Sequence, residues 1–124
     1  MTIANRNVKT HTAKTTLNDI GKGAVDTHGA PGVTMYVKFG AGTTAGAVKL
    51  QGSPTGAGGE DVQASDADWS DIGAPVAWGA ASSTKDLSVA EAHRYVRAKI
   101  STAIVGGTVD VYIATAGFAS GGWD

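Results

Sequence analysis

The sequence predicts an all-β protein, an antiparallel β-sandwich or jelly-roll-like domain of seven or eight short strands with an extended N-terminal arm. Val, Ile and Thr, whose branched side chains favour the pleated surface of a sheet, provide 32 of the 124 residues. The 18 glycines divide the chain into short pieces and suit tight turns. Several segments alternate apolar and polar residues with the period of two that is typical of half-buried strands. Helical segments do not alternate with these strands, which argues against an α/β fold.

The apolar residues supply a thin core for a single domain. Leu, Ile, Val and Phe total 23 residues, and 21 alanines provide much of the remaining apolar content. The formal net charge is only −1, so charge repulsion does not oppose folding. We therefore expect one domain of marginal stability that gains from burying more surface against a partner.

Residues 1–32 are predicted to form a polar N-terminal arm with a first strand near residues 11–17. The arm carries four cationic side chains against two anionic ones. The cations are Arg6, Lys9, Lys14 and Lys22. Such an arm can add a strand to the sheet edge of a neighbouring protein. Residues 33–116 are predicted to form the sandwich, and residues 117–124 a flexible C-terminal tail.

The first clear strands are predicted at residues 33–39 and 45–51. The odd-numbered positions of the first strand are apolar, and Val48 and Leu50 of the second should point inward. The glycine-rich turn at residues 40–44 favours a hairpin between them.

An acidic, glycine-rich loop is predicted at residues 52–68. Between residues 50 and 71 the chain has five carboxylates and no cation. Further short strands are expected at residues 69–72, 75–78 and 85–89, with one helical turn at most near residues 88–93.

The two longest strands are predicted at residues 94–104 and 108–115, joined as a hairpin by Gly106 and Gly107. Alternation places Val96, Ala98 and Ile100 inward in the first strand, and Val109, Val111 and Ile113 inward in the second. Tyr95, Arg97 and Lys99 are expected on the opposite, outward face. Arg97 or Lys99 would then face Asp110 across the hairpin.

Several classes of protein are excluded or disfavoured by composition. Without cysteine the chain has no disulfide framework, thiolate metal site or cysteine nucleophile. The N-terminus lacks the apolar region of a secretory signal, and no apolar run is long enough to span a membrane. The nearly neutral charge argues against nucleic-acid binding.

No residue is predicted to serve in catalysis, to hold a cofactor or to bind a metal ion, and we expect no enzyme activity. The three histidines are not spaced as metal ligands, and no serine motif completes a triad with Asp26 and His28. Asp66, Asp68 and Asp71 supply oxygens suited to calcium, but a solvated acidic loop explains them better. The glycine clusters lack the sequence of a phosphate-binding loop.

The candidate partner-interface residues are cationic and aromatic side chains, which are enriched in protein interfaces or suit acidic partners. They are Arg6, Lys9, Lys14, Tyr95, Arg97, Tyr112 and Trp123. Trp69 is expected in the core or at its rim. Trp123 is either an anchor in a partner's pocket or exposed to solvent, and the sequence leaves both open.

Five short segments resemble, in order, the capsid decoration (cement) proteins of tailed bacteriophages. They are residues 18–23 (NDIGKG), 33–39 (VTMYVKF), 48–53 (VKLQGS), 93–97 (HRYVR) and 107–109 (GTV). The resemblance implies a small jelly-roll-type sandwich without catalysis, bound to the outer surface of the capsid and assembled in the host cytoplasm. It also implies a dimer or trimer that clamps neighbouring major capsid protein subunits and thereby stabilises the shell.

Two other functions stay open. A carbohydrate-binding module, or a fibre or tail module of a phage particle, would present two aromatic side chains side by side, yet the Trp and Tyr residues do not cluster in one pair of predicted strands. A small hydrolase would use His28 or His93. We expect no nucleic-acid or membrane partner in any case.

Overall fold

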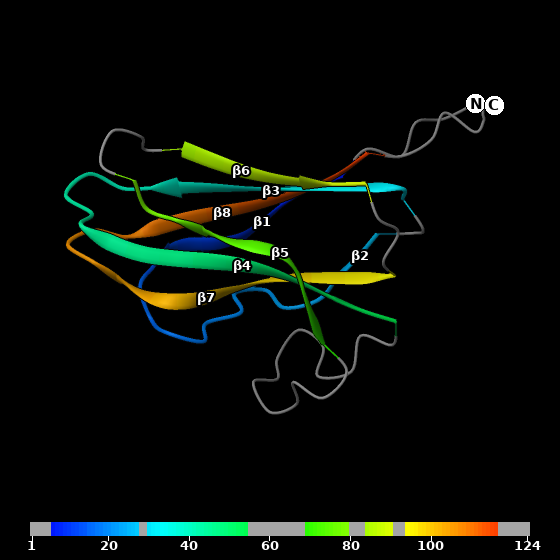
Figure 1. The fold of residues 1–124 in the computed structure, drawn as a ribbon, viewed down its shortest axis with the longest axis horizontal. Helices are drawn as coiled ribbons and strands as arrows, with labels where there is room; N and C mark the ends of the chain where they lie inside the picture. Colours follow the sequence, from blue (N-terminus) through cyan, green and yellow to red (C-terminus); the bar gives the residue numbers. More distant parts are fainter. Residues whose placement is uncertain (1–5, 28–29, 55–68, 80–83, 91–93, 117–124) are drawn as a thin grey trace.

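Two four-stranded antiparallel sheets stack face to face in the computed structural model, which describes residues 6–27, 30–54, 69–79, 84–90 and 94–116. Figure 1 shows the two layers edge-on. The described part of the chain contains strands and no helix. The strands are β1 (Arg6–Lys14), β2 (Val25–Asp26), β3 (Gly32–Phe39), β4 (Ala45–Ser53), β5 (Ser70–Ala77), β6 (Thr84–Val89), β7 (Tyr95–Val105) and β8 (Val109–Ala116). The predicted all-β sandwich is thus confirmed.

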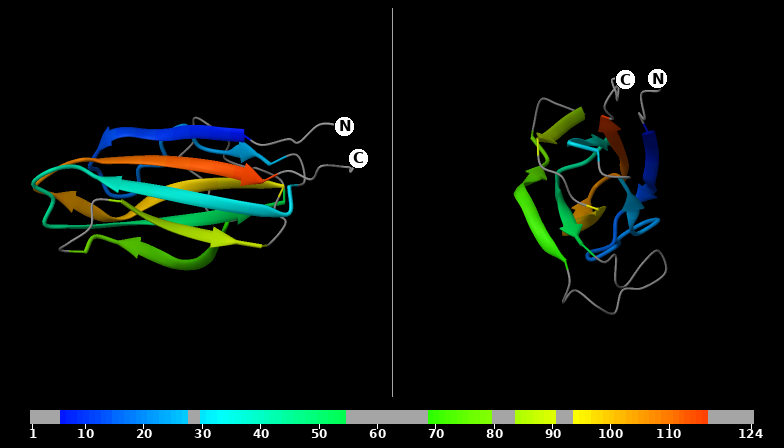
Figure 2. Two further views of the ribbon diagram at one scale, coloured as in Figure 1. Left: turned by 90° about the horizontal axis from the view of Figure 1, so that it is seen from above. Right: turned by 90° about the vertical axis from the view of Figure 1, so that its right-hand side faces the viewer.

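The strand order is β1-β8-β3-β6 in one sheet and β2-β7-β4-β5 in the other. Figure 2 (left) looks onto the first sheet, with β1 in blue, β8 in orange and β3 in cyan. The order shows that both predicted hairpins are wrong, because β3 and β4 lie in different sheets, as do β7 and β8. Each of these strands buries one face on the shared core. Alternation alone therefore does not distinguish a hairpin from a crossing between layers.

Two of the turns at which the chain crosses between the sheets, the one after β3 and the one after β7, are hydrogen-bonded to each other. The Gly40 N–H donates to the Thr108 carbonyl at 2.7 Å, and the Thr44 N–H donates to the Val105 carbonyl at 2.8 Å. Gly106 has a φ of +85°, which favours glycine, and a side chain there would meet the carbonyl of Gly42.

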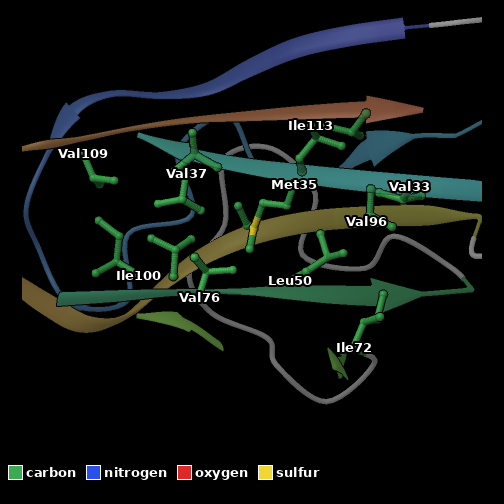
Figure 3. Packing of buried hydrophobic residues seen from close by; sticks show 14 of the residues in the cluster. Val33, Met35, Val37, Leu50, Ile72, Val76, Val96, Ile100, Val109 and Ile113 are labelled. Atoms are coloured by element: carbon green, nitrogen blue, oxygen red, sulfur yellow. The ribbon is translucent and has the colours of Figure 1, made fainter. Parts of the chain in front are cut away.

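The core lies between the sheets and is built from alternate residues of the long strands. Met35, Val37, Leu50, Ile100 and Ile113 are completely buried. Figure 3 shows the labelled side chains of both sheets pointing toward one another across this layer. The predicted inward positions of 33–39, 45–51 and 108–115 are confirmed by this burial.

The N-terminal segment belongs to the sandwich. Its strand begins at Arg6, earlier than the predicted 11–17, and pairs with β8 of the same chain. The following residues run beside β7: the Asn18 N–H donates to the Ile100 carbonyl at 2.8 Å, and the Ile104 N–H to the Thr15 carbonyl at 3.0 Å. An arm extended onto a neighbour does not describe residues 6–27, since β1 pairs with β8 and is an edge strand of its own sheet.

Two smaller differences concern strand number. Residues 70–77 form one strand in place of the two predicted, and the two-residue β2 was missed because so short a segment shows no period. β6 lies where residues 85–89 were expected to form a strand. The predicted helical turn falls partly, and the C-terminal tail wholly, outside the described residues. The described segments also contain no helix long and apolar enough to cross a membrane.

Truncating a core leucine tests the importance of this layer. Leu50→Ala should lower the free energy of unfolding by about 2–5 kcal/mol, because it leaves a cavity between the sheets. Leu17, which is 49% exposed, provides the matched control: Leu17→Ala should change stability by less than about 0.5 kcal/mol. Urea unfolding of both variants measures the difference, and equal losses would contradict the described core.

Candidate interaction surface

The outer side of the β1-β8-β3-β6 sheet presents two tyrosines surrounded by charged side chains. We call it the tyrosine face. Its defining residues are Lys9, Tyr36, Lys38, Asp86, Asp110 and Tyr112. They project outward because their neighbours along each strand, such as Val37 and Val111, are buried in the core.

Tyr36 and Tyr112 lie directly opposite each other on β3 and β8. Tyr36 is 41% exposed. The Lys9 ammonium lies 5.4 Å from the centre of the Tyr112 ring and 3.7 Å from a carboxylate oxygen of Asp110. Exposed contacts of this kind contribute less than about 1 kcal/mol each, so they orient the side chains more than they stabilise the fold.

A cationic groove borders the tyrosine face along β1. It has a volume of about 360 Å³. It is lined by Lys9, Thr10, Thr12, Lys14, Asp19, Gly21 and Lys22. Three ammonium groups against one carboxylate give the groove a net positive charge. Gly21 is required here, because its φ is +58° and a side chain would collide with the Thr10 carbonyl.

His11 lies buried under this groove. Its Nε2 is 2.9 Å from the Asp19 carbonyl, and its Nδ1 is 2.8 Å from the Thr10 hydroxyl. A carbonyl only accepts, so Nε2 carries a proton and, in the neutral ring, Nδ1 accepts from Thr10. Burial lowers the pKa of His11, although the Asp19 carbonyl and carboxylate partly oppose this shift.

The outer side of the second sheet differs from its prediction. Arg97 was expected on an exposed face, but it is completely buried. Its guanidinium lies 4.4 Å from the centre of the Trp69 ring, and its Nε donates to Gln51 at 2.8 Å. The strand alternation was correct, but the Trp69 ring lies against the Arg97 guanidinium and Arg97 has no exposed surface, so its outward direction does not lead to solvent.

The Arg97 hydrogen bond is part of a longer polar chain. The Gln51 amide donates to Asp71 at 2.9 Å, and Lys49 lies 3.2 Å from the same carboxylate. The Gln51 and Lys49 hydrogen bonds lower the pKa of Asp71. Lys99, also predicted to be outward and exposed, is 9% exposed. Asp110 does not face Arg97 or Lys99 and is paired in register with Lys38.

The structure therefore brings together only some of the predicted interface residues. Lys9, Lys14 and Tyr112 lie on the β1–β8 side of the molecule. Tyr95 and Arg97 lie on the other sheet, where Tyr95 is half-buried and pairs with Ser53. Arg6 begins β1 opposite Thr115, and Trp123 lies outside the described residues.

Most of the histidine and acidic-loop residues weighed in the sequence analysis are not placed by the structure. His28, His93, Asp66 and Asp68 lie outside the described residues. Within the described ranges no three His, Asp or Glu side chains are grouped as metal ligands.

Tyr36, Lys38 and Asp86 were missed as interface candidates. Their outward positions follow from alternation in their own strands. Their proximity to Tyr112 depends on β8 lying beside β3, which no local pattern indicates.

Comparison with known proteins identifies the fold. No family model and no curated protein matches the sequence. Among solved structures, the crystal structure of the SPBc2 prophage-derived protein YomS is similar to this chain with a TM-score of 0.53 and 13% sequence identity. The match covers 94% of this chain and 96% of that one, so the similarity of fold extends over nearly the full length of both.

The buried His11 predicts a stability that depends on pH. The unfolded chain takes up a proton near pH 6.5, whereas the folded state does so only at lower pH. The free energy of unfolding should therefore be highest above pH 6.5 and fall as the pH drops through that value toward the lowered pKa. Urea unfolding between about pH 8 and about pH 5 measures this slope.

His11→Gln provides the comparison, because it retains His28 and His93. The variant should show a shallower fall in stability over the same pH range. An identical slope in both proteins would assign the pH dependence to other groups.

Proposed function

We propose that this protein is a bacteriophage virion structural protein that decorates the capsid and stabilises it by clamping neighbouring major capsid protein subunits. The observation that carries the proposal is the fold, which matches a prophage-derived protein over nearly the full length of both chains. The sequence resemblance to capsid decoration proteins adds the specific role.

The mechanism follows from surface burial and repetition. A bound copy that contacts two capsid subunits raises the free energy needed to separate them, because binding favours the assembled state. Many copies act on one shell, so weak individual contacts suffice. The cationic groove offers Lys14 and Lys22 as the contact to acidic side chains of the capsid protein.

Co-sedimentation with capsids built from the major capsid protein of the same phage tests the proposal. The protein should sediment with the shells in a fixed ratio to the capsid protein. A monomer or oligomer that stays in the supernatant at all concentrations would refute the decoration role.

Charge reversal in the groove tests the contact surface. The double variant Lys14→Glu, Lys22→Glu should lower capsid affinity by about tenfold or more, because repulsion replaces attraction. Lys85→Glu, on β6 at the opposite edge of the same sheet, is the control and should bind as the wild type does. Equal losses in both variants would show that the groove is not the contact.

A carbohydrate-binding or fibre module is the second candidate, and one observation favours it. Tyr36 and Tyr112 lie side by side on neighbouring strands, as an aromatic platform for a sugar ring requires. A glycan array would then show binding that Tyr36→Ala abolishes. Absence of binding to any glycan would exclude the carbohydrate-binding module.

A further inference from the structure

We propose that the tyrosine face binds a second copy of this chain, forming a symmetric dimer whose twofold axis lies between β3 and β8 and parallel to them. The inference rests on the strand register and not on the proposed function.

The central row of the face is complementary to itself. Across the four strands it reads Lys9, Tyr112, Tyr36 and Asp86, since each is the register partner of the next. A cation stands at one end, an anion at the other, and the two tyrosines stand in the middle. Rotation about the proposed axis reverses the row, so Lys9 of one copy faces Asp86 of the other and the tyrosines stack.

The neighbouring row obeys the same symmetry. Lys38 and Asp110 are register partners on β3 and β8, one on each side of the axis. Rotation places Lys38 of each copy opposite Asp110 of its partner. On the other side of the central row, Thr34 and Ala114 face each other in the same manner without a charge conflict. One axis therefore satisfies all three rows.

A twofold axis in a different direction does not give favourable charge contacts in these rows. A twofold axis running along the central row would place Lys9 on Lys9 and Asp86 on Asp86, and like charges disfavour such a contact. The charge arrangement thus selects one orientation of the dimer. It also keeps the strands of the two facing sheets aligned, as sheets that stack face to face prefer.

The available area fits a dimer of moderate affinity. Four strands of this length cover about 500 Å² on each copy, or about 1,000 Å² in total. This is the lower limit for a specific interface, so complementarity decides whether it forms. Exposed Tyr36 at the centre provides the aromatic anchor.

Sedimentation equilibrium of the purified chain, without capsids, tests the proposal. The wild type should show a reversible monomer–dimer equilibrium. Asp86→Lys should raise its dissociation constant by about tenfold or more, because it faces Lys9 of the partner. Combining it with Lys9→Asp should return the constant to within about threefold of the wild type, because the pair is restored with exchanged signs.

Tyr36→Ala should also dissociate the dimer, whereas Tyr95→Ala, on the other sheet, should leave it intact. Circular dichroism confirms that each variant is folded. A wild type that remains monomeric at all concentrations would overturn the proposal, as would a dimer that resists Tyr36→Ala or a charge exchange that restores nothing. Capsid co-sedimentation is a separate measurement, so either proposal can fail alone.

Discussion

The crossing of the chain between its two sheets is the constraint on which the rest of the molecule depends. The turns that follow β3 and β7 lie side by side and share backbone hydrogen bonds, so these two changes of layer occur at the same end of the sandwich. This double crossing sends β4 to pair with β7 and β8 to pair with β3. The apolar faces of these four strands then oppose each other across the core, and Tyr36 is placed beside Tyr112 on the outside.

Local pattern predicted more about burial than about pairing. The inward positions of residues 33–39 and 108–115 could be read from alternation, because burial on one face imposes a period of two. The pairing partner of each strand could not be predicted in this way, since a strand buries the same face whether the chain forms a hairpin or crosses to the other sheet. Arg97 shows a second limit: its direction was correct, yet it is completely buried and contacts Trp69, which lies nearly thirty residues earlier in the sequence. The interface candidates lie on two different sheets, because the sequence pattern does not show which strands pair with each other.

The charged side chains on the two outer faces of the sandwich differ in their surroundings. On the second sheet, Arg97, Gln51 and Asp71 form a continuous set of hydrogen bonds within the chain, partly covered by an aromatic ring. On the first sheet, charged groups stand at register positions around exposed Tyr36 and half-buried Tyr112. A covered polar network fixes local structure, whereas exposed charges in an antisymmetric arrangement favour one partner orientation over another. The proposed dimer face and the cationic groove thus both belong to the first sheet and its β1 edge.

The contact between Gly42 and Gly106 limits how the lengths of the two turns can change in related sequences. Backbone meets backbone there, with no side chain between the two turns to absorb a change. A residue inserted into one turn would displace the other, so the lengths of both turns must change together or not at all.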